Sequence, residues 1–393
     1  MKTVSVLGST GSVGRSTVDL ILSSPENFAV QVLTAQKNAE LLAEQARKTK
    51  ARKAVIGDES LRPFLSELLA GTGIEVAAGR QAVIDAGAEP ADWVMAAIVG
   101  MAGLEPLLAA INQGCAVAIA NKEPLVAAGP LVIALAHEKG TTLLPVDSEH
   151  NAIFQVFEPD NRSAVERLVL TASGGPFRTW AKEQIARATP AQAVAHPNWS
   201  MGAKISIDSA SMMNKALEVI EAHYLFSMPP EKIEVLVHPQ SVIHSMVEYA
   251  DGSFLAQLGA PDMKTPIAYA LAWPRRMQTS GARLDIGRLR QLDFSAPDHE
   301  KFPLLPLAYG CLRGGQSACV AFNAANEVAV AAFLQEKIGF TDIYRVVSEA
   351  LEQNQQGGAL QSLEDILLLD HTVRRLCESY INSFTSLKRA GHS

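Results

Sequence analysis

Residues 4–22 read VSVLGSTGSVGRSTVDLIL, and this stretch decides the fold of the first part of the chain. Apolar residues 4–7 predict a buried strand, and residues 18–22 predict a helix. Between them lies a glycine-rich turn spaced G-x-x-G-x-x-G, where the usual spacing is G-x-G-x-x-G. Glycines let the backbone approach a pyrophosphate, and the N-terminus of the next helix offers it free N–H groups. The stretch therefore indicates a dinucleotide site; the alternative is an ordinary turn between a strand and a helix.

The end of the second predicted strand, residues 28–33, distinguishes the two nicotinamide dinucleotides. An enzyme that uses NAD usually places an acidic side chain here, on the ribose 2′-hydroxyl. This chain has no acid before Glu40 and carries Lys37, which is placed to meet a 2′-phosphate. The sequence therefore favours NADP. The alternative for Lys37 is a solvated lysine that opens the next helix.

Strand and helix patterns alternate as far as residue 146. The further expected strands are residues 54–56, 74–76, 93–99, 116–120 and 142–146, and the expected helices are residues 61–69, 104–111 and 124–137. This alternation predicts an α/β fold with a doubly wound parallel sheet. Ligands bind such sheets at the carboxyl ends of the strands, which is where Asn121, Lys122 and Glu123 stand. Lys122 is placed to meet a substrate oxyanion and Asn121 a nicotinamide ribose; a plain helix start explains the triplet equally well.

Residues 146–150, VDSEH, end an apolar strand in two carboxylates, a hydroxyl and an imidazole. If the strand geometry continues, Asp147 and Glu149 point to the same side. Two carboxylates aimed together repel unless a cation or a shared proton lies between them. The pair therefore predicts a divalent metal at a domain junction. The alternative is a loop acid followed by an acid that caps a helix.

A helix expected within residues 209–226 supplies a third carboxylate. Asn214 and Lys215 lie four and three residues before Glu218, so the three side chains share one face. Ser209 lies near the helix start, where free N–H groups favour phosphate. Three carboxylates suit Mg²⁺ or Mn²⁺, because zinc would require more His or Cys. An exposed Lys–Glu pair is the alternative.

Two loops also carry polar or bulky side chains. Ser173 and two glycines follow a predicted strand and can form a small anion nest, which is a common feature. Residues 195–202 contain His196, Trp199 and Met201, and large side chains on such a loop suit a lid that excludes water. The alternative is that Trp199 and Met201 are core residues.

The remaining segments predict a meander of strands and a helical bundle. Residues 233–237, 242–249 and 253–258 read as three short strands, the last two joined by an Asp-Gly hairpin turn. Their mixed faces hint at a dimer. Beyond them, Asn323 and Asn326 interrupt an apolar helix, and we expect them to form caps or hydrogen bonds between helices.

Length and composition limit the possibilities further. The chain has 393 residues, which exceeds one typical core. We expect a dinucleotide-binding Rossmann-like domain at 1–146, a catalytic metal- and substrate-binding domain with dimerisation strands at 147–275, a linker at 276–300 and a helical domain at 301–393. A net charge of −7 without a long basic run argues against a nucleic-acid partner. Four cysteines without a C-x-x-C pair, no apolar leader and no membrane-length apolar run indicate a cytoplasmic protein with no membrane partner.

Taken together, the motifs resemble the 1-deoxy-D-xylulose 5-phosphate reductoisomerase family of the non-mevalonate isoprenoid pathway. They are GSTGSVG at 8–14, NKE at 121–123, VDSEH at 146–150, ASGG at 172–175, HPNWSMG at 196–202, DSASMMNK at 208–215 with Glu218, and NAANE at 323–327. The resemblance implies isomerisation of 1-deoxy-D-xylulose 5-phosphate and its reduction to 2-C-methyl-D-erythritol 4-phosphate. It also implies NADPH, Mg²⁺ or Mn²⁺, and a homodimer.

The resemblance further implies a role for each matching residue. The metal ligands are Asp147, Glu149 and Glu218, which together with Lys122 form the catalytic set. The substrate contacts are Lys122, Ser148, Glu149, Ser173, His196, Trp199, Met201, Ser209, Asn214, Lys215 and Glu218. The NADPH contacts are Thr10, Gly11, Ser12, Val13, Gln36, Lys37, Asn38, Asn121, Glu123 and Gly202. Gln36 stands where the family usually has a small residue, which leaves its adenosine contact open.

Two other classes of function compete with this interpretation. A different NADP oxidoreductase, such as an aldehyde dehydrogenase, would need a nucleophilic cysteine, but Cys115 has no histidine nearby in the sequence. A dinucleotide-sensing binding protein would need neither a lid nor a carboxylate trio. We therefore expect an enzyme.

Overall fold

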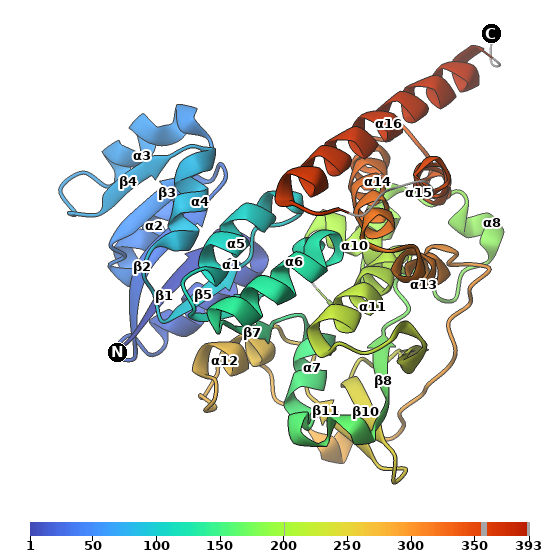
Figure 1. Ribbon diagram of the computed structural model, residues 1–393, viewed down its shortest axis with the longest axis horizontal. Coiled ribbons are helices and arrows are strands. Elements are labelled where there is room, and N and C mark those ends of the chain that lie inside the picture. The colour runs from blue at the N-terminus through green and yellow to red at the C-terminus, as the bar shows by residue number, and fades with distance from the viewer. Residues whose placement is uncertain (200, 355–359, 391–393) are drawn as a thin grey trace. The chain divides into compact units, whose positions relative to one another are not determined.

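The computed structural model describes residues 1–199, 201–354 and 360–390, and the chain forms two compact units (Figure 1). The first unit comprises Met1–Pro124, Leu131–Gln155 and Asp262–Arg283, and the second comprises Leu125–Pro130, Val156–Pro261 and Leu284–Ser393. The four-segment division expected from the sequence stays a prediction.

A parallel sheet of seven strands forms the centre of the first unit, in the order β4-β3-β2-β1-β5-β6-β7. The strands are β1 Lys2–Leu7, β2 Phe28–Ala35, β3 Lys53–Ile56, β4 Glu75–Ala78, β5 Trp93–Ala96, β6 Ala116–Ile119 and β7 Thr142–Pro145. The helices are α1 Ser12–Leu22, α2 Ala39–Thr49, α3 Arg62–Leu68, α4 Arg80–Ala88, α5 Leu104–Ile111, α6 Glu123–Lys139, α7 Ser148–Val156 and α12 Lys264–Ala272. Residues 125–130 of α6 are assigned to the second unit. The predicted doubly wound parallel sheet is confirmed, and strand order reverses between β1 and β5.

One strand of this sheet is shorter than predicted. The sequence pattern extends to residue 99, but β5 ends at Ala96, where its neighbour β1 also ends at Leu7. A strand has no further ladder partner once its neighbour turns away, so the remaining apolar residues enter a loop. That loop starts at the carboxyl edge of the sheet.

The chain returns to the first unit after residue 261 and packs α12 against the sheet. The indole N–H of Trp93 on β5 donates a hydrogen bond to the carbonyl of Ala270 over 3.0 Å. The ammonium of Lys2 donates to the carbonyl of Leu271 over 3.0 Å. Ile267 and Leu271 lie in the same buried cluster as Val4 and Trp93. Helix α12 therefore completes the core of the sheet.

The second unit contains a mixed four-stranded sheet in the order β11-β10-β8-β9. The strands are β8 Val165–Ala172, β9 Ile233–Val237, β10 Ile243–Tyr249 and β11 Phe254–Leu258. The β10–β11 hairpin through Asp251 and Gly252 is confirmed, with Gly252 at φ +84°. The predicted meander of β9, β10 and β11 is wrong, because β8 lies between β9 and β10. The end of β8 is buried and apolar, which favours a central strand with two neighbours.

Helices make up the rest of the second unit. They are α8 Lys182–Ile185, α9 Pro190–Val194, α10 Ala203–Ala210, α11 Met213–Phe226, α13 Leu304–Gly314, α14 Gln316–Leu334, α15 Asp342–Gln353 and α16 Leu363–Ala390. Short 3₁₀ turns lie at Glu59–Leu61 and Met101–Gly103 in the first unit and at Pro159–Ala164, Pro230–Lys232 and Ile286–Arg288 in the second. Helix α14 packs against α13, α15 and α16, which confirms the predicted helical bundle.

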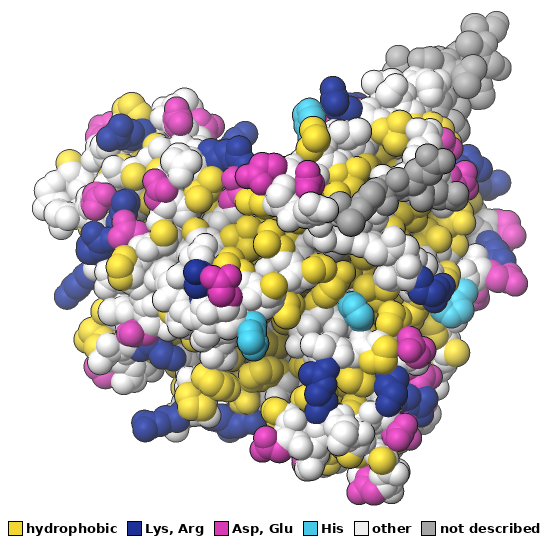
Figure 2. All heavy atoms as spheres, in the orientation of Figure 1, with side chains coloured by type: hydrophobic (Ala, Val, Ile, Leu, Met, Phe, Trp, Pro, Cys, Tyr) yellow, Lys and Arg dark blue, Asp and Glu magenta, His cyan; other side chains and the backbone are white. Residues whose placement is uncertain are grey.

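Helix α14 is long and apolar enough to cross a membrane by length and composition alone, and 72% of its apolar window is buried. A core helix of a soluble protein has the same properties, and the neighbours of α14 in the bundle account for its apolar surface. On the visible face of the first unit, acidic and basic side chains are interspersed (Figure 2).

In the glycine-rich turn between β1 and α1, the backbone at Gly14 lies close to the backbone at Gly8 and Ser9. A Cβ added to Gly14 would lie 2.2 Å from the carbonyl oxygen of Gly8 and 2.6 Å from the Cα of Ser9. Neither of these backbone atoms can move aside without distorting the turn. At Gly11 the nearest atom to an added Cβ would be 3.4 Å away, which is an ordinary contact. The turn therefore requires glycine at position 14 and tolerates a side chain at position 11.

We expect Gly14→Ala to lower the melting temperature by roughly 5 °C or more. Overpacking costs about 1–3 kcal/mol, and each kcal/mol corresponds to roughly 2–4 °C in a unit of this size. Gly11→Ala is the matched control and should leave the melting temperature nearly unchanged. Differential scanning calorimetry of the two variants measures this. If both variants lowered the melting temperature equally, position 14 would be no more restricted to glycine than position 11.

Candidate active site

Four strands of the first unit end in residues that the sequence assigned to ligand binding. Thr10, Gly11, Ser12 and Val13 follow β1; Gln36, Lys37 and Asn38 follow β2; Asn121, Lys122 and Glu123 follow β6; and Asp147, Ser148 and Glu149 follow β7. Because all these strands are parallel, the residues share the carboxyl edge of one sheet. This is the edge at which open α/β sheets bind their ligands.

The turn after β2 holds its three predicted cofactor residues in different ways. Asn38 accepts a hydrogen bond from the N–H of Leu41 over 3.0 Å and so caps α2. Gln36 covers Gly57, because a Cβ added to Gly57 would lie 2.3 Å from the Gln36 Oε1. Lys37 is exposed. Of the three side chains, Lys37 is the one that can pair with an added anion without breaking a contact.

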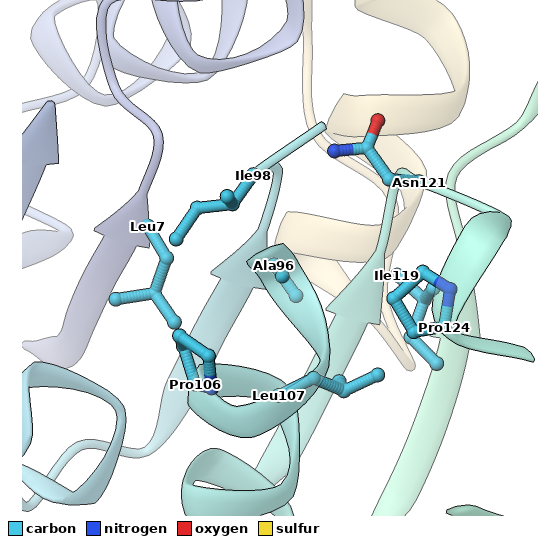
Figure 3. A pocket seen from close by; sticks show the side chains of 9 residues that line it. Leu7, Ala96, Ile98, Pro106, Leu107, Ile119, Asn121 and Pro124 are labelled. Atoms are coloured by element: carbon cyan, nitrogen blue, oxygen red, sulfur yellow. The ribbon is translucent and has the colours of Figure 1, made fainter. Parts of the chain in front are cut away.

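A small apolar pocket opens at the carboxyl ends of β1, β5 and β6 (Figure 3). Its walls include Leu7, Ala96, Pro106 and Ile119, and Asn121 stands at its rim. The Nδ2 of Asn121 is buried and has no hydrogen-bond partner within the described part of the chain. A buried amide N–H without a partner costs free energy that a bound polar ligand would recover. The pocket therefore combines apolar walls with a buried polar donor at its rim.

Lys122 and Asp147 form a buried ion pair at the same edge. The side chains are only 6% and 14% exposed, and the ammonium contacts the Oδ2 of Asp147. Strand β7 ends at Pro145 and α7 starts at Ser148, so strand geometry does not continue through this turn, contrary to our assumption. The N–H of Asn151 donates to the Asp147 carbonyl over 2.8 Å, which starts the helix. The carboxylates of Asp147 and Glu149 therefore lie at the N-terminus of α7.

Glu149 stands in the first turn of α7. The hydroxyl of Ser148 donates to its Oε2 over 2.5 Å. Glu149 therefore lies where the positive end of the helix dipole favours negative charge. The buried ring of His150 places its Nδ1 4.0 Å from the Oδ2 of Asp147.

Helix α11 of the second unit presents its three predicted residues on one face. The amide of Asn214 donates to one oxygen of Glu218, and the ammonium of Lys215 pairs with the other. The Glu218 and Lys215 side chains are 0% and 4% exposed. The alternative of an exposed surface pair is therefore wrong, and α11 holds a buried charge whose oxygens both have partners.

Ser173, His196 and Gly175 form a second polar cluster in this unit. The hydroxyl of Ser173 lies 2.9 Å from the Nε2 of His196 and accepts a hydrogen bond from the N–H of Gly175. The Nδ1 of His196 accepts from the N–H groups of Asn198 and Trp199 over 3.2 and 3.0 Å. Because Nδ1 accepts two hydrogen bonds, it carries no proton, and we assign the ring proton to Nε2. Nε2 then donates a hydrogen bond to the hydroxyl of Ser173.

The loop expected to act as a lid, residues 195–202, is bonded to the connection between β9 and β10. The amide of Asn198 donates to the carbonyl of Pro239 over 2.8 Å and to the hydroxyl of Ser241 over 3.0 Å. The Trp199 ring lies 6.0 Å from the ring of His244. Trp199 and Met201 are half-buried, so the loop does not place them in the core. Gly202 comes directly before α10, and Ser200 lies outside the described residues.

Comparison with known proteins identifies the family. Family models described as 1-deoxy-D-xylulose 5-phosphate reductoisomerase, its C-terminal domain and the DXP reductoisomerase C-terminal domain match residues 4–129, 143–226 and 258–376. A protein of that name from Rhodospirillum centenum is 58% identical over 381 residues, 97% of this chain and 94% of that protein. This chain belongs to the 1-deoxy-D-xylulose 5-phosphate reductoisomerase family. The resemblance inferred from the motifs is thereby confirmed.

Solved structures of reductoisomerases have the same fold. The Zymomonas mobilis enzyme in complex with NADPH has a TM-score of 0.91 and 53% identity, covering 97% of this chain and 98% of that one. A reductoisomerase in complex with NADPH, fosmidomycin and magnesium has a TM-score of 0.93 and 43% identity, with the same coverage. Each of these complexes describes the ligands of that protein.

Two side chains in this reductoisomerase stand in the quoted motifs but received no role in the sequence analysis. His150 lies near Asp147, and its position one helical turn later was the signal that could have found it. Asp208 is buried on α10 and bonds to a helix 118 residues away in the sequence. No local pattern indicates such a distant partner.

The cysteines do not supply a nucleophile for this reductoisomerase. Cys115 is half-buried, and burial raises the pKa of its thiol to about 11. Burial likewise raises the pKa of Cys319 to about 12. Burial disfavours the thiolate, which is the reactive form. The competing interpretation, an oxidoreductase with a cysteine nucleophile, therefore lacks its essential group.

We expect the native chain to react with iodoacetamide very slowly at pH 8 and to keep its activity. Only about one thiol in a thousand is ionised three pH units below a pKa of about 11, and alkylation requires the thiolate. The rate at Cys115 should rise with pH up to about 11. Mass spectrometry after timed labelling measures it. Rapid labelling at pH 8 with loss of turnover would restore the cysteine hypothesis.

Proposed function

We propose that this chain isomerises 1-deoxy-D-xylulose 5-phosphate and reduces it to 2-C-methyl-D-erythritol 4-phosphate, a step of the non-mevalonate isoprenoid precursor pathway. The observation that carries the proposal is 58% identity to a reductoisomerase over 97% of the chain. The site residues of the family are present, and the structure gives each of the two units buried, paired polar groups. The enzyme requires NADPH and a divalent metal.

The carboxyl edge of the seven-stranded sheet supports the assignment of NADPH. The glycine turn permits backbone approach at Gly14, and α1 starts directly after it at Ser12. Exposed Lys37 is the cation for the 2′-phosphate, and the buried amide of Asn121 is the donor at the apolar pocket. We assign the remaining contacts to Thr10, Gly11, Val13, Gln36, Asn38, Glu123 and Gly202.

The carboxylates support a divalent metal. Asp147, Glu149 and Glu218 offer hard oxygen atoms of the kind that Mg²⁺ and Mn²⁺ prefer. In each unit a lysine already pairs with one of these carboxylates: Lys122 with Asp147 and Lys215 with Glu218. When bound, the metal supplies Lewis-acid polarisation of the substrate carbonyl.

The other side chains bind and orient the sugar phosphate. We assign the phosphate to the hydroxyls of Ser173 and Ser209, the Nε2–H of His196, and the Asn214 and Lys215 side chains. We assign the oxygens of the reacting carbons to Lys122 and Ser148 beside the carboxylates, with Glu149 among the substrate contacts. Trp199 and Met201 then exclude water. Binding energy from the phosphate positions the reacting end for isomerisation and hydride transfer.

We expect Glu218→Gln to lower kcat at least 100-fold while NADPH binding changes less than twofold. The amide keeps the shape but removes the charge that a divalent ion requires, and no predicted NADPH contact lies on α11. NADPH oxidation with 1-deoxy-D-xylulose 5-phosphate and Mn²⁺ measures the first effect, and NADPH fluorescence titration measures the second. Wild-type chain in EDTA should also be inactive.

The matched control for this experiment is Glu221→Gln, a buried acid one turn further along α11. It should keep most of the activity. Full turnover by Glu218→Gln would contradict the metal assignment. Wild-type chain that turns over in EDTA would contradict metal dependence altogether.

A cytoplasmic homodimer completes the proposal. The four cysteines are free thiols, which suits a reducing compartment. Strand β11 is an edge strand of the mixed sheet, and its Phe254, Leu255 and Leu258 side chains are 46%, 39% and 40% exposed. An edge strand with exposed apolar side chains favours pairing with another copy. We infer that the strands expected to mediate dimerisation do so through β11.

We expect Leu258→Lys to raise the dimer dissociation constant at least tenfold, because it places a charge on the apolar edge of β11. Sedimentation velocity over a concentration series measures this. Leu368→Lys is the control, since Leu368 is 66% exposed on α16, away from that edge. The proposed interface would be contradicted if the wild-type chain were a monomer, or if both substitutions raised the dissociation constant equally.

A further inference from the structure

A buried hydrogen bond joins the helical bundle to α10. The amide Nδ2 of Asn326 on α14 donates to the Oδ1 of Asp208 over 2.9 Å. Asn326 and Asp208 are 0% and 1% exposed. The ammonium of Lys204 lies 2.8 Å from the other carboxylate oxygen, Oδ2. Both oxygens of this buried carboxylate therefore have a partner, one of them supplied by the helical bundle.

Asp208 lies in the last turn of α10, next to Ser209. The loop that contains Gly175 packs on this turn, because a Cβ added to Gly175 would lie 2.5 Å from the carbonyl oxygen of Ser209. After α10 the chain turns through Met212, a non-glycine residue at φ +60°, and α11 begins at once at Met213. A shift at the end of α10 would therefore move Ser209 and the loop of Ser173 together.

We propose that the Asp208–Asn326 hydrogen bond positions the groups that bind the substrate phosphate. This inference rests on the proposed function and assigns part of that function to the helical bundle. Without the amide donor, a buried carboxylate oxygen loses its partner, and the turn must move to bring it to water or to another donor. Asn326 is a positioning residue, because it acts on Ser209 through Asp208 and does not itself touch substrate. Misplacement of binding groups by about 1 Å can cost a factor of about 100 in rate.

Helix α14 offers a matched pair of variants. Asn323 lies one turn before Asn326 and is equally buried, but its amide donates to Glu327 of the same helix over 3.2 Å. Asn326→Leu and Asn323→Leu thus remove the same group from the same helix at the same burial. Only Asn326→Leu removes a bond to α10.

We expect Asn326→Leu to raise the KM for 1-deoxy-D-xylulose 5-phosphate about tenfold, with a smaller effect on kcat and none on the KM for NADPH. Asn323→Leu should change none of the three constants by more than about twofold, although both variants lose stability. Initial rates at varied substrate and varied NADPH measure this. Equal KM values in the two variants would overturn the proposal.

A swap of the two side chains covers the case in which Asn326→Leu does not fold. Asn326→Asp alone sets two carboxylates against each other and should raise the KM for the sugar phosphate. Asp208→Asn combined with Asn326→Asp restores one donor and one acceptor, with the bond reversed. The double variant should recover most of the lost affinity. A double variant no better than Asn326→Asp would overturn the proposal.

Inorganic phosphate separates this inference from the proposed reaction. Phosphate should raise the melting temperature of wild type and Asn323→Leu, and raise that of Asn326→Leu much less. If wild type binds phosphate in this pattern but does not oxidise NADPH with the ketose phosphate, the reaction assignment fails and the positioning role stands. No phosphate shift in wild type, or the same shift in all three proteins, overturns the positioning role.

Discussion

The cost of burying a carboxylate is the constraint on which the rest of this structure depends. Glu218 has no exposed surface, and an isolated charge there would be several kcal/mol unfavourable, so both of its oxygens need partners. Asn214 and Lys215 supply them from the preceding turn of the same helix. Their spacing is that of neighbours on a helix face, so the charge is stable only while α11 is intact. The helix thereby fixes the position of Glu218, the acid that we propose as a metal ligand.

The same constraint recurs in both units with different partners. Asp147 pairs with Lys122 across two neighbouring strand ends of the parallel sheet, and Asp208 takes partners from its own helix and from α14. Under the proposed function, Lys122 and Lys215, which neutralise these carboxylates, also contact the substrate. Buried acid–lysine pairs therefore serve stability and recognition at once, because the groups that balance the charge stand beside the site.

How much could be predicted from the sequence depended on the distance along the chain over which the interactions act. The parallel sheet followed from alternating patterns, and the face shared by Asn214 and Glu218 followed from helical spacing. The return of α12 to the sheet did not, because Trp93 and Ala270 are 177 residues apart. The position of β8 between β9 and β10 was not predicted for the same reason, since no local period in the sequence encodes which strands pair. The direction in which the Asp147 side chain points was predicted from strand geometry. That prediction was wrong because the strand ends before Asp147 and a helix starts directly after it.

Polar side chains on α14 give the helical bundle a role beyond covering apolar surface. Apolar packing specifies the register of a helix less sharply than buried polar groups do, because hydrophobic side chains of similar volume can replace one another. Asn326 and Glu327 remove that freedom, since the first bonds to Asp208 and the second pairs with Arg374 on α16 over 2.7 Å. Each bond is satisfied in one register only, and any other would bury polar groups without partners. Through Asn326, the bundle thus fixes the position of α10, the helix that contains Ser209.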